Sequence, residues 1–438
     1  MDDLPADLYY DGADFVFCSV QKEYPATITD QDLVADRYTN SVYERTLAVS
    51  ERLGVNFEEE FSTKYVDSVR AGDDTYKLVH HRGIYVFQHA AEGLGYLWSD
   101  IDTVDLTKNY WFDDINANLS IGGRLITAAG AYNISTYTYT FAILFNKKLI
   151  EDYGLEDPYQ VVRDGKWTWE KFAEFGVKGA YELDGDGNMT EADAWGFFCS
   201  PKVAPQSFTK AANTLLLTKD ENDYPVYTLD SDEHFVEVFT RIFELLYDGR
   251  FWMYTDASDG DIPATGIRVF NAGRALMIDC TFLSIPQFRD MDADFGVIPY
   301  PKYDEAQDEY YSENENIFLP MIPSSLRLSD AKMAGAVMEA MSSYAIRYTI
   351  PEYYEVLLKT KLARDEESGE MFDIIMAHRV FDPALFYIPD VERLVRELFM
   401  NMKRDKIVSD LARKAGTFDT QIEELIVGFE ENVKSVLE

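Results

Sequence analysis

The stretch Asp14-Phe-Val-Phe-Cys-Ser19 is a short apolar run that ends in polar residues, and it predicts a buried β-strand. A helical pattern follows and stops at Gly54, a usual residue at a helix end. A second apolar segment begins at Val55, and another helical pattern runs from it to Gly72. The segment Tyr76-Lys-Leu-Val-His80 then predicts a further strand. This alternation of strands and helices predicts an α/β domain with a largely parallel sheet.

Polar residues follow two of these predicted strands, at the point where each strand ends. In open α/β sheets, ligands bind beyond the carboxyl ends of the strands. Three consecutive polar groups directly after a buried strand also need either solvent or a ligand. The predicted ligand-binding residues at this edge of the sheet are Ser19, Gln21, Tyr24, His80, His81 and Arg82.

The rest of the chain continues the mixed pattern. Phe141-Ala-Ile-Leu-Phe145 predicts a strong strand, and Thr168 is a plausible N-cap for a helix that contains Trp169. An amphipathic helix is expected from about Ser231, with its apolar stripe in the core. The last third is mostly helical and ends in a long amphipathic segment over residues 407–433.

The composition restricts the partners of the chain. Its 438 residues carry 40 Lys and Arg against 78 Asp and Glu, which gives a formal net charge of −38. Nucleic acid, polyphosphates and anionic membranes would be repelled by that charge, so neutral or cationic ligands are expected. Aromatic residues make up 14% of the chain, more than a core of this size usually requires. We therefore expect some rings to line a surface on which a ligand stacks.

Two other classes are excluded by the sequence. The three cysteines lie far apart, so neither a disulfide framework nor a zinc site is expected. The longest apolar runs are far shorter than the roughly 18–20 residues that cross a bilayer. The chain starts Met-Asp-Asp-Leu-Pro without a visible signal peptide. That start fits a cytoplasmic protein, and it fits equally well a mature secreted domain whose targeting segment has been removed.

The clearest chemical motif is Glu182-Leu-Asp-Gly-Asp-Gly-Asn-Met-Thr-Glu-Ala-Asp193, which matches the spacing of a twelve-residue calcium loop. It departs from that pattern at position one, where Glu replaces Asp, and at position twelve, where Asp replaces a bidentate Glu. Acidic glycine-rich turns also occur without metal, so the alternative is a metal-free turn. The predicted ligands of a structural Ca²⁺ are Glu182, Asp184, Asp186, Asn188, Thr190 and Asp193.

Four collinear segments together resemble the family 1 extracellular solute-binding proteins, the receptor lipoproteins of carbohydrate ABC importers. The segments are Leu144-Phe-Asn-Lys-Lys-Leu-Ile-Glu-Asp-Tyr-Gly-Leu155 with Gly165-Lys-Trp-Thr-Trp-Glu-Lys-Phe172, Phe270-Asn-Ala-Gly-Arg-Ala-Leu-Met277, Phe295-Gly-Val-Ile-Pro-Tyr-Pro-Lys-Tyr-Asp304 and Lys361-Leu-Ala-Arg-Asp-Glu-Glu-Ser-Gly-Glu-Met-Phe-Asp373. Each motif alone is common. Their order and spacing carry the resemblance, which extends from about Asp14 to the last helix.

The resemblance implies a two-lobed periplasmic-binding-protein-like fold of type II, with hinge-linked lobes that close around a ligand. It places residues 1–135 and 301–348 in the first lobe, and residues 140–298 and 350–438 in the second. It further implies a monomer that captures a sugar or oligosaccharide and delivers it to the permease subunits of an ABC transporter. The native precursor would be extracellular and lipid-anchored, although this sequence shows neither the signal peptide nor the anchor cysteine.

The resemblance also implies further binding residues along the chain. Phe282 stands where sugar-binding relatives often place an aromatic platform, and Trp98, Trp111 and Trp252 are further ring candidates. The residues carried over from corresponding segments are Tyr132, Asn133, Ser135, Lys202, Gln206, Asp279 and Phe282.

An enzymatic function is not expected, because no GxSxG, HExxH, P-loop or GxGxxG motif is present and the five histidines are scattered. No organic cofactor is expected either. Two alternatives to an importer subunit stay open. One is a glycan-sensing receptor that signals to a kinase, and the other, less favoured, is a glycoside hydrolase with a carboxylate pair across the cleft.

Overall fold

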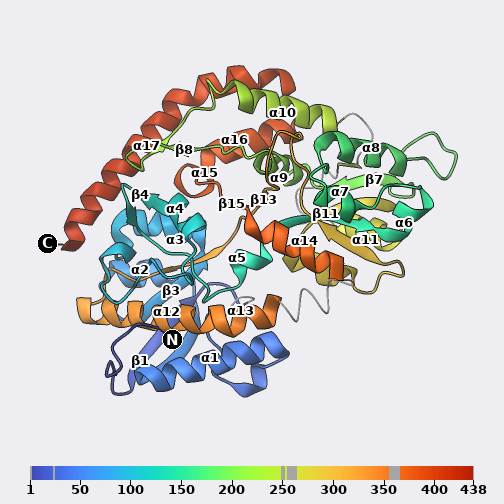
Figure 1. Cartoon of the computed structure of the whole chain (residues 1–438). Coiled ribbons are helices and arrows are strands. Elements are labelled where there is room, and N and C mark those ends of the chain that lie inside the picture. Colours follow the sequence, from blue (N-terminus) through green and yellow to red (C-terminus); the bar gives the residue numbers. More distant parts are fainter. Residues whose placement is uncertain (1, 23–24, 248–251, 254–263, 355–365, 438) are drawn as a thin grey trace.

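Two β-sheets organise the chain, and each has its own set of helices (Figure 1). The structure is a computed structural model that describes residues 2–22, 25–247, 252–253, 264–354 and 366–437. In the view of Figure 1, the first sheet lies at the lower left with α1 (Arg37–Leu53) and α12 (Leu328–Arg347). The second sheet lies at the right with α7 (Pro158–Arg163), α8 (Trp169–Gly179) and α11 (Ala264–Asn271). The bounds of the strands are β1 Ala13–Ser19, β2 Val55–Phe61, β3 Tyr76–Arg82, β4 Ser120–Ile121, β5 Arg124–Leu125, β6 Phe141–Asn146, β7 Trp195–Cys199, β8 Thr218–Lys219, β9 Pro225–Val226, β10 Trp252–Met253, β11 Ala275–Thr281, β12 Phe295–Ile298, β13 Ser312–Glu313, β14 Phe318–Met321 and β15 Arg379–Val380.

The first sheet has the order β14-β3-β1-β2 within the described residues. β1 pairs in parallel with both β2 and β3, while β14 pairs antiparallel with β3. The predicted largely parallel sheet is therefore confirmed, with one antiparallel strand added at its edge. Gly54 ends the helix before β2 with a φ of 65°, a left-handed conformation that suits glycine. The carboxyl ends of β1 and β3 lie at one edge of this sheet.

The second sheet has the order β10-β7-β11-β6-β12 within the described residues. All residues of β6, β7, β11 and β12 are buried, which agrees with their largely apolar sequences. β7 and β11 run parallel, and β6 runs antiparallel to β11. The carboxyl ends of β7 and β11 therefore share an edge with the start of β6.

Helices cover both sheets and also connect them. The helices with bounds described by the structure are α1 Arg37–Leu53, α2 Tyr65–Arg70, α3 Gly83–His89, α4 Asp113–Leu119, α5 Ser135–Thr138, α6 Lys147–Asp152, α7 Pro158–Arg163, α8 Trp169–Gly179, α9 Ala204–Ala211, α10 Glu233–Leu246, α11 Ala264–Asn271, α12 Leu328–Arg347, α13 Thr349–Pro351, α14 Glu366–Ala377, α15 Ala384–Tyr387, α16 Pro389–Met400 and α17 Ile407–Leu437, with short 3-10 or π turns η1 Gln31–Leu33, η2 Ala90–Leu94, η3 Trp98–Asp100, η4 Phe282–Phe288 and η6 Arg404–Lys406. None of the described helices is long and apolar enough to span a membrane.

The local predictions for the helices hold with one shift. Thr168 is the N-cap of α8, and its side chain accepts a hydrogen bond from the Lys171 backbone N–H. α10 begins two residues later than Ser231, because Asp232 supplies the capping carboxylate to the Phe235 N–H. The predicted apolar stripe of this helix is buried.

The C-terminal helices contact both halves of the molecule. α15 packs against α3 beside the first sheet, whereas α16 packs against α9 beside the second. α17 contacts η2 and lies along the upper edge of the molecule in Figure 1. One continuous hydrophobic core includes residues from both sheets. The division of the chain into lobes at residues 135, 301, 348 and 350 stays a prediction.

Candidate functional site

A cavity of about 480 Å³ lies where the edge of the first sheet meets the edge of the second. Gln21 follows β1 and Arg82 ends β3, and both line it. Phe282 and Leu283, which follow β11, line it from the second sheet. The full set of described lining residues is Gln21, Pro25, Ile28, Tyr38, Thr39, Val42, Arg82, Ile134, Thr138, Tyr139, Phe282, Leu283, Pro286 and Tyr353. The cavity therefore lies between the two sheets, at the carboxyl ends of their strands.

Three of the predicted binding residues are brought together here. Gln21, Arg82 and Phe282 come from sequence positions far apart, yet they line one cavity. The Phe282 ring also packs edge-on against Phe372, with centroids 4.9 Å apart. Tyr24, predicted beside Gln21, lies outside the described residues.

Of the three residues His80, His81 and Arg82, Arg82 lines the cavity. His81 points to the opposite face of the strand, because successive side chains alternate, whereas His80 is on the same face as Arg82 but lies in the interior. His80 is fully buried, and its Nε2 lies 3.2 Å from Nδ2 of Asn133. His81 stacks on Tyr85 with centroids 4.7 Å apart. Burial lowers the pKa of His80 to about 3 and that of His81 to about 4, so both rings are neutral at pH 7.

Ser19 lies inside the protein and takes part in holding the loop that borders the cavity. Its hydroxyl donates a hydrogen bond to the Glu59 carboxylate. The same carboxylate accepts hydrogen bonds from the backbone N–H groups of Ala26, at 2.8 Å, and Thr27, at 2.9 Å. Arg45, also buried, donates to the carbonyl of Ala26 at 2.6 Å and to the carbonyl of Tyr132. Glu59 and Arg45 thus fix the segment after β1 in place.

The predicted residues near the first crossing are buried around the cavity wall. Tyr132 is 2% exposed and packs edge-on against His80. The Asn133 side chain accepts a hydrogen bond from the Ser135 N–H at 2.7 Å. The Ser135 hydroxyl accepts one from the Phe318 N–H at 2.9 Å. Ile134 is the residue of this segment that lines the cavity.

Lys202, Gln206 and Asp279 are not among the described residues that line the cavity. Lys202 is partly exposed in the turn after β7. Gln206, in α9, donates its side-chain amide to Glu392 inside a separate buried polar cluster. Asp279 is 1% exposed within β11.

The additional ring candidates lie elsewhere. Trp98 and Trp111 are fully buried and pack edge-on against each other, with centroids 5.6 Å apart. The indole N–H of Trp111 donates to Glu339 at 2.9 Å. Both rings are core residues, so they offer no stacking surface. The side chain of Trp252 lies outside the described residues.

Sequence reasoning missed most of the aromatic wall. Tyr38, Tyr139 and Tyr353 line the cavity together with Phe282. Tyr38 and Tyr353 pack edge-on, with centroids 5.6 Å apart, although more than 300 residues separate them in the sequence. Only Tyr139 lies close to a predicted segment, four residues after Ser135. Folding assembles the rest of this wall, and no local motif marks it.

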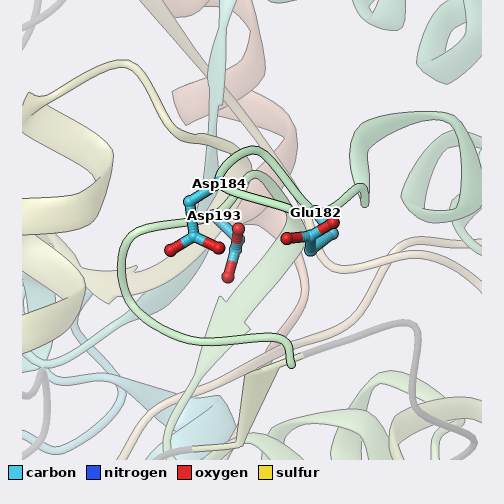
Figure 2. Close-up of side chains that lie close together, drawn as sticks. All are labelled: Glu182, Asp184 and Asp193. Atoms are coloured by element: carbon cyan, nitrogen blue, oxygen red, sulfur yellow. The ribbon is translucent and has the colours of Figure 1, made fainter. Parts of the chain in front are cut away.

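The acidic loop brings three of its predicted metal ligands together (Figure 2). Carboxylate oxygens of Glu182, Asp184 and Asp193 lie within 4.8 Å of one another. Asp193 is buried, and its carboxylate accepts hydrogen bonds from the N–H groups of Leu183 and Thr190 at 2.8 and 2.7 Å.

The other predicted ligands of this loop bond within the turn. The Asp186 carboxylate accepts the Asn188 N–H at 2.7 Å, and the Asn188 amide donates to the Asp186 carbonyl. The Thr190 hydroxyl lies 3.1 Å from the Asp193 carboxylate. The chemistry of the donor set, three clustered carboxylates among oxygen-rich neighbours, fits a hard divalent cation.

Comparisons with known proteins give a consistent picture of the fold. No protein-family model matches the chain, and no curated protein matches it. Among solved structures, the family 1 extracellular solute-binding protein from Bifidobacterium longum subsp. infantis is similar, with a TM-score of 0.59 and 13% identity over 97% of this chain and 100% of that one. Apo RafE from Streptococcus pneumoniae has a TM-score of 0.58 and 14% identity, over 93% of this chain and 98% of that one.

A cyclo/maltodextrin-binding protein complexed with maltotetraose is similar to the same degree, with a TM-score of 0.58 and 14% identity over 98% of each chain. Matches that span nearly the whole length of both chains show that this chain has the two-lobed α/β fold of solute-binding proteins. The fold predicted from the resemblance is thereby confirmed.

Proposed function

We propose that the protein is an extracellular solute-binding protein that captures a sugar or oligosaccharide between its two sheets. The observation that carries the proposal is the 480 Å³ cavity, which residues from both sheets line and which has four aromatic side chains in its wall. The similar structures include RafE in complex with raffinose and a protein complexed with maltotetraose. Their fold, together with the cavity, supports the binding of a saccharide.

The chemistry of the wall suits this ligand class. Sugar rings carry C–H faces that pack on aromatic side chains, and Tyr38, Tyr139, Phe282 and Tyr353 supply such surfaces. Gln21 supplies an amide that donates and accepts hydrogen bonds with hydroxyl groups. Individual stacking and hydrogen-bonding contacts contribute on the order of 1 kcal/mol each. A handful of them therefore reaches micromolar affinity, about −8 kcal/mol.

A glycan screen tests the proposal. The whole chain is titrated with a panel that includes raffinose and maltotetraose, by thermal shift and calorimetry, and the glycans are recovered and analysed afterwards. We expect saturable binding with the glycan unchanged. Gln21→Ala should weaken binding several-fold, whereas Gln31→Ala, an exposed glutamine outside the described cavity lining, should not. Consumption of the glycan would instead indicate a hydrolase, and a panel without any binder would contradict the proposal.

The proposal extends to partners and location. A binding protein of this fold would deliver its saccharide to the permease subunits of an ABC transporter, from the outer face of the cytoplasmic membrane, where a lipid would anchor its native precursor. We propose that it acts as a monomer. The alternative is a sensor that presents the same closed form to a kinase, and co-purification from membranes with permease subunits would favour the importer.

We further propose that the loop over residues 182–193 binds a structural Ca²⁺. The support is the placement of three carboxylates within 4.8 Å of one another, at positions that match a calcium loop. The cation would offset the mutual repulsion of these groups and fix a loop that follows α8. Glu182, Asp184 and Asp193 would hold it.

A further inference from the structure

Arg82 lies at the wall of the cavity, and among the described residues it has no acidic side chain as a counter-ion. It is the last residue of β3, where β14 pairs with it through Phe318. Its Nε is buried and has no hydrogen-bond partner, and the described residues form no ion pair with its guanidinium. Arg163, by contrast, forms ion pairs with Glu367 and Glu370 at 3.1 and 2.6 Å.

The charge of the cavity has the opposite sign to that of the whole protein. The chain carries a net charge of −38, yet Arg82 is the charged side chain among the described residues that line the cavity, and none of the others is acidic. His81, its neighbour in the strand, is neutral at pH 7 because burial lowers its pKa to about 4. The described side chains that line the cavity therefore carry one formal positive charge and no negative charge.

An unpaired guanidinium beside an apolar wall recognises an anion better than a neutral group. Arg82 is half-buried, and withdrawing part of a charge from water without a partner is costly, so a ligand that supplies the partner lowers that cost. Arginine binds a carboxylate through two parallel hydrogen bonds, which are stronger than those to a hydroxyl. A cavity of about 480 Å³ lies within the usual range for small-molecule sites, roughly 300–1,000 Å³.

We propose that the preferred ligand is an acidic saccharide whose uronic-acid carboxylate pairs with Arg82. This inference rests on the proposed function and specifies its ligand class. One carboxylate differs from the polyanions that the net charge excludes, because the Debye length of about 8 Å at physiological salt screens most of the distant acidic surface. The rings of the wall would pack on the sugar, while Arg82 would select the carboxylate.

The test compares each acidic saccharide with its own neutral form. Calorimetry at pH 7 uses galacturonic- and glucuronic-acid mono-, di- and trisaccharides, the same compounds as methyl esters, and the neutral sugars of the glycan screen. We expect at least one acid to bind at least tenfold more tightly than its ester. Arg82→Gln should weaken acid binding by about 10–100-fold, the range expected for lost hydrogen bonds to a charged group, and change ester binding less than threefold.

Two further variants separate charge from geometry. Arg82→Lys keeps the positive charge but cannot form the bidentate hydrogen bonds of arginine to a carboxylate, so it should retain an intermediate preference for the acid. Arg413→Gln removes the same charge from an exposed position in α17 and should change neither affinity. If Arg82→Gln fails to fold, the affinities of the unmodified protein for the acid and for its ester still show whether the protein prefers the acidic saccharide.

The outcomes distinguish this inference from the proposed function. If neutral sugars and esters bind as tightly as the acids, or Arg82→Gln weakens both forms equally, the acidic ligand class is wrong and saccharide binding stands. If no saccharide of either kind binds the unmodified protein, the proposed function fails, and this inference fails with it.

Discussion

At the scale of single residues, the cavity depends on side chains that do not line it. Glu59 accepts hydrogen bonds from the Ser19 hydroxyl, from two backbone N–H groups and, at 3.0 Å, from the Thr27 hydroxyl. Burial raises the pKa of Glu59, and the hydrogen bonds it accepts oppose that shift. Because Gln21, Pro25 and Ile28 border the cavity, the carboxylate of Glu59 sets the position of part of its wall.

Glu59→Ala should therefore cost both stability and affinity. The substitution leaves the N–H groups of Ala26 and Thr27, which are buried, without acceptors, so the free energy of unfolding should fall by about 2–3 kcal/mol. Saccharide affinity should fall as well, because the loop loses its fixed position. Urea unfolding and calorimetry measure the two effects. Glu58→Ala, at the exposed adjacent position, should change the stability by less than about 0.5 kcal/mol. Equal effects of the two substitutions would refute the role of Glu59.

A second group of buried polar residues lies in α9, β13 and the C-terminal segment. Lys210 forms an ion pair with Asp382 at 2.8 Å, and the Ser207 hydroxyl donates to Glu313 at 2.5 Å. Glu392 lies in the same cluster, so three carboxylates share one buried lysine, and Arg396 contacts Glu392 at the edge. Burial raises the pKa of Glu313 to about 7, with Lys210 opposing and the two other carboxylates adding to the shift.

This shift predicts a pH dependence of stability with a definite sign. Between the unfolded pKa of 4.5 and the folded pKa of about 7, the folded state binds more protons, so stability falls as the pH rises through that window. Glu313→Gln resembles the neutral form at every pH. The unfolding free energy of this variant relative to the native chain should therefore rise from pH 5 to pH 8, on the order of 1–3 kcal/mol.

Urea titrations at pH 5, 6, 7 and 8 measure this difference between Glu313→Gln and the native chain. Glu221→Gln, which changes an exposed glutamate, should show a flat difference over the same range. A flat difference for Glu313→Gln as well would show that Glu313 is ionised throughout, with Lys210 as its effective partner.

At the scale of elements, local chemistry made some of the principal strands and helices predictable. Continuous apolar runs predicted β1 and β6, and the left-handed Gly54 and the capping Thr168 marked real helix ends. The site was predictable only in part. Gln21 and Arg82 follow from strand ends, whereas Tyr38 and Tyr353 meet through tertiary packing, which leaves no local pattern. His81 and Arg82 point to opposite faces of the strand, because successive side chains alternate. Three consecutive polar residues in the sequence do not by themselves show which of them faces the cavity.

The acidic loop carries the prediction that belongs to this scale. If Ca²⁺ binds the folded loop alone, a hundredfold excess over Kd stabilises the protein by roughly 2.7 kcal/mol. Chelator should therefore lower the melting temperature of the native chain, and Asp184→Ala should remove most of the difference. Mg²⁺ should substitute poorly, because it demands a tighter octahedral site. Glu305→Ala, in another exposed acidic stretch, should keep the calcium effect. Identical melting curves with chelator and with millimolar calcium would show a metal-free turn.

At the scale of the whole molecule, the cavity is lined by residues from both sheets, and the chain passes more than once from one sheet to the other. The segment from β5 to β6 and the segment from β12 to β14 both pass between the sheets. Later in the chain, α13 contacts α1 beside the first sheet and α14 contacts β12 of the second. Because several chain segments connect the two sheets, the expected motion of one sheet relative to the other is a rotation about the hinge that these segments form. The C-terminal helices add a second constraint, because α15 contacts α3 beside the first sheet and α16 contacts α9 beside the second. Rotation of one sheet against the other must therefore also shift these contacts.

Ligand binding should consequently make the molecule more compact. A saccharide that contacts Arg82 on one sheet and Phe282 on the other binds best when both walls reach it, so it favours the closed arrangement by its difference in affinity. Small-angle X-ray scattering should show a smaller radius of gyration with the tightest binder of the glycan screen at saturation, against a value of about 22 Å expected for a compact chain of 438 residues. Gln21→Ala should require more ligand for the same decrease, because Gln21 lines the cavity and lies outside the segments that connect the two sheets. A profile that stays unchanged at saturation would mean that the cavity is rigid and already closed, and that delivery of the ligand does not use a hinge.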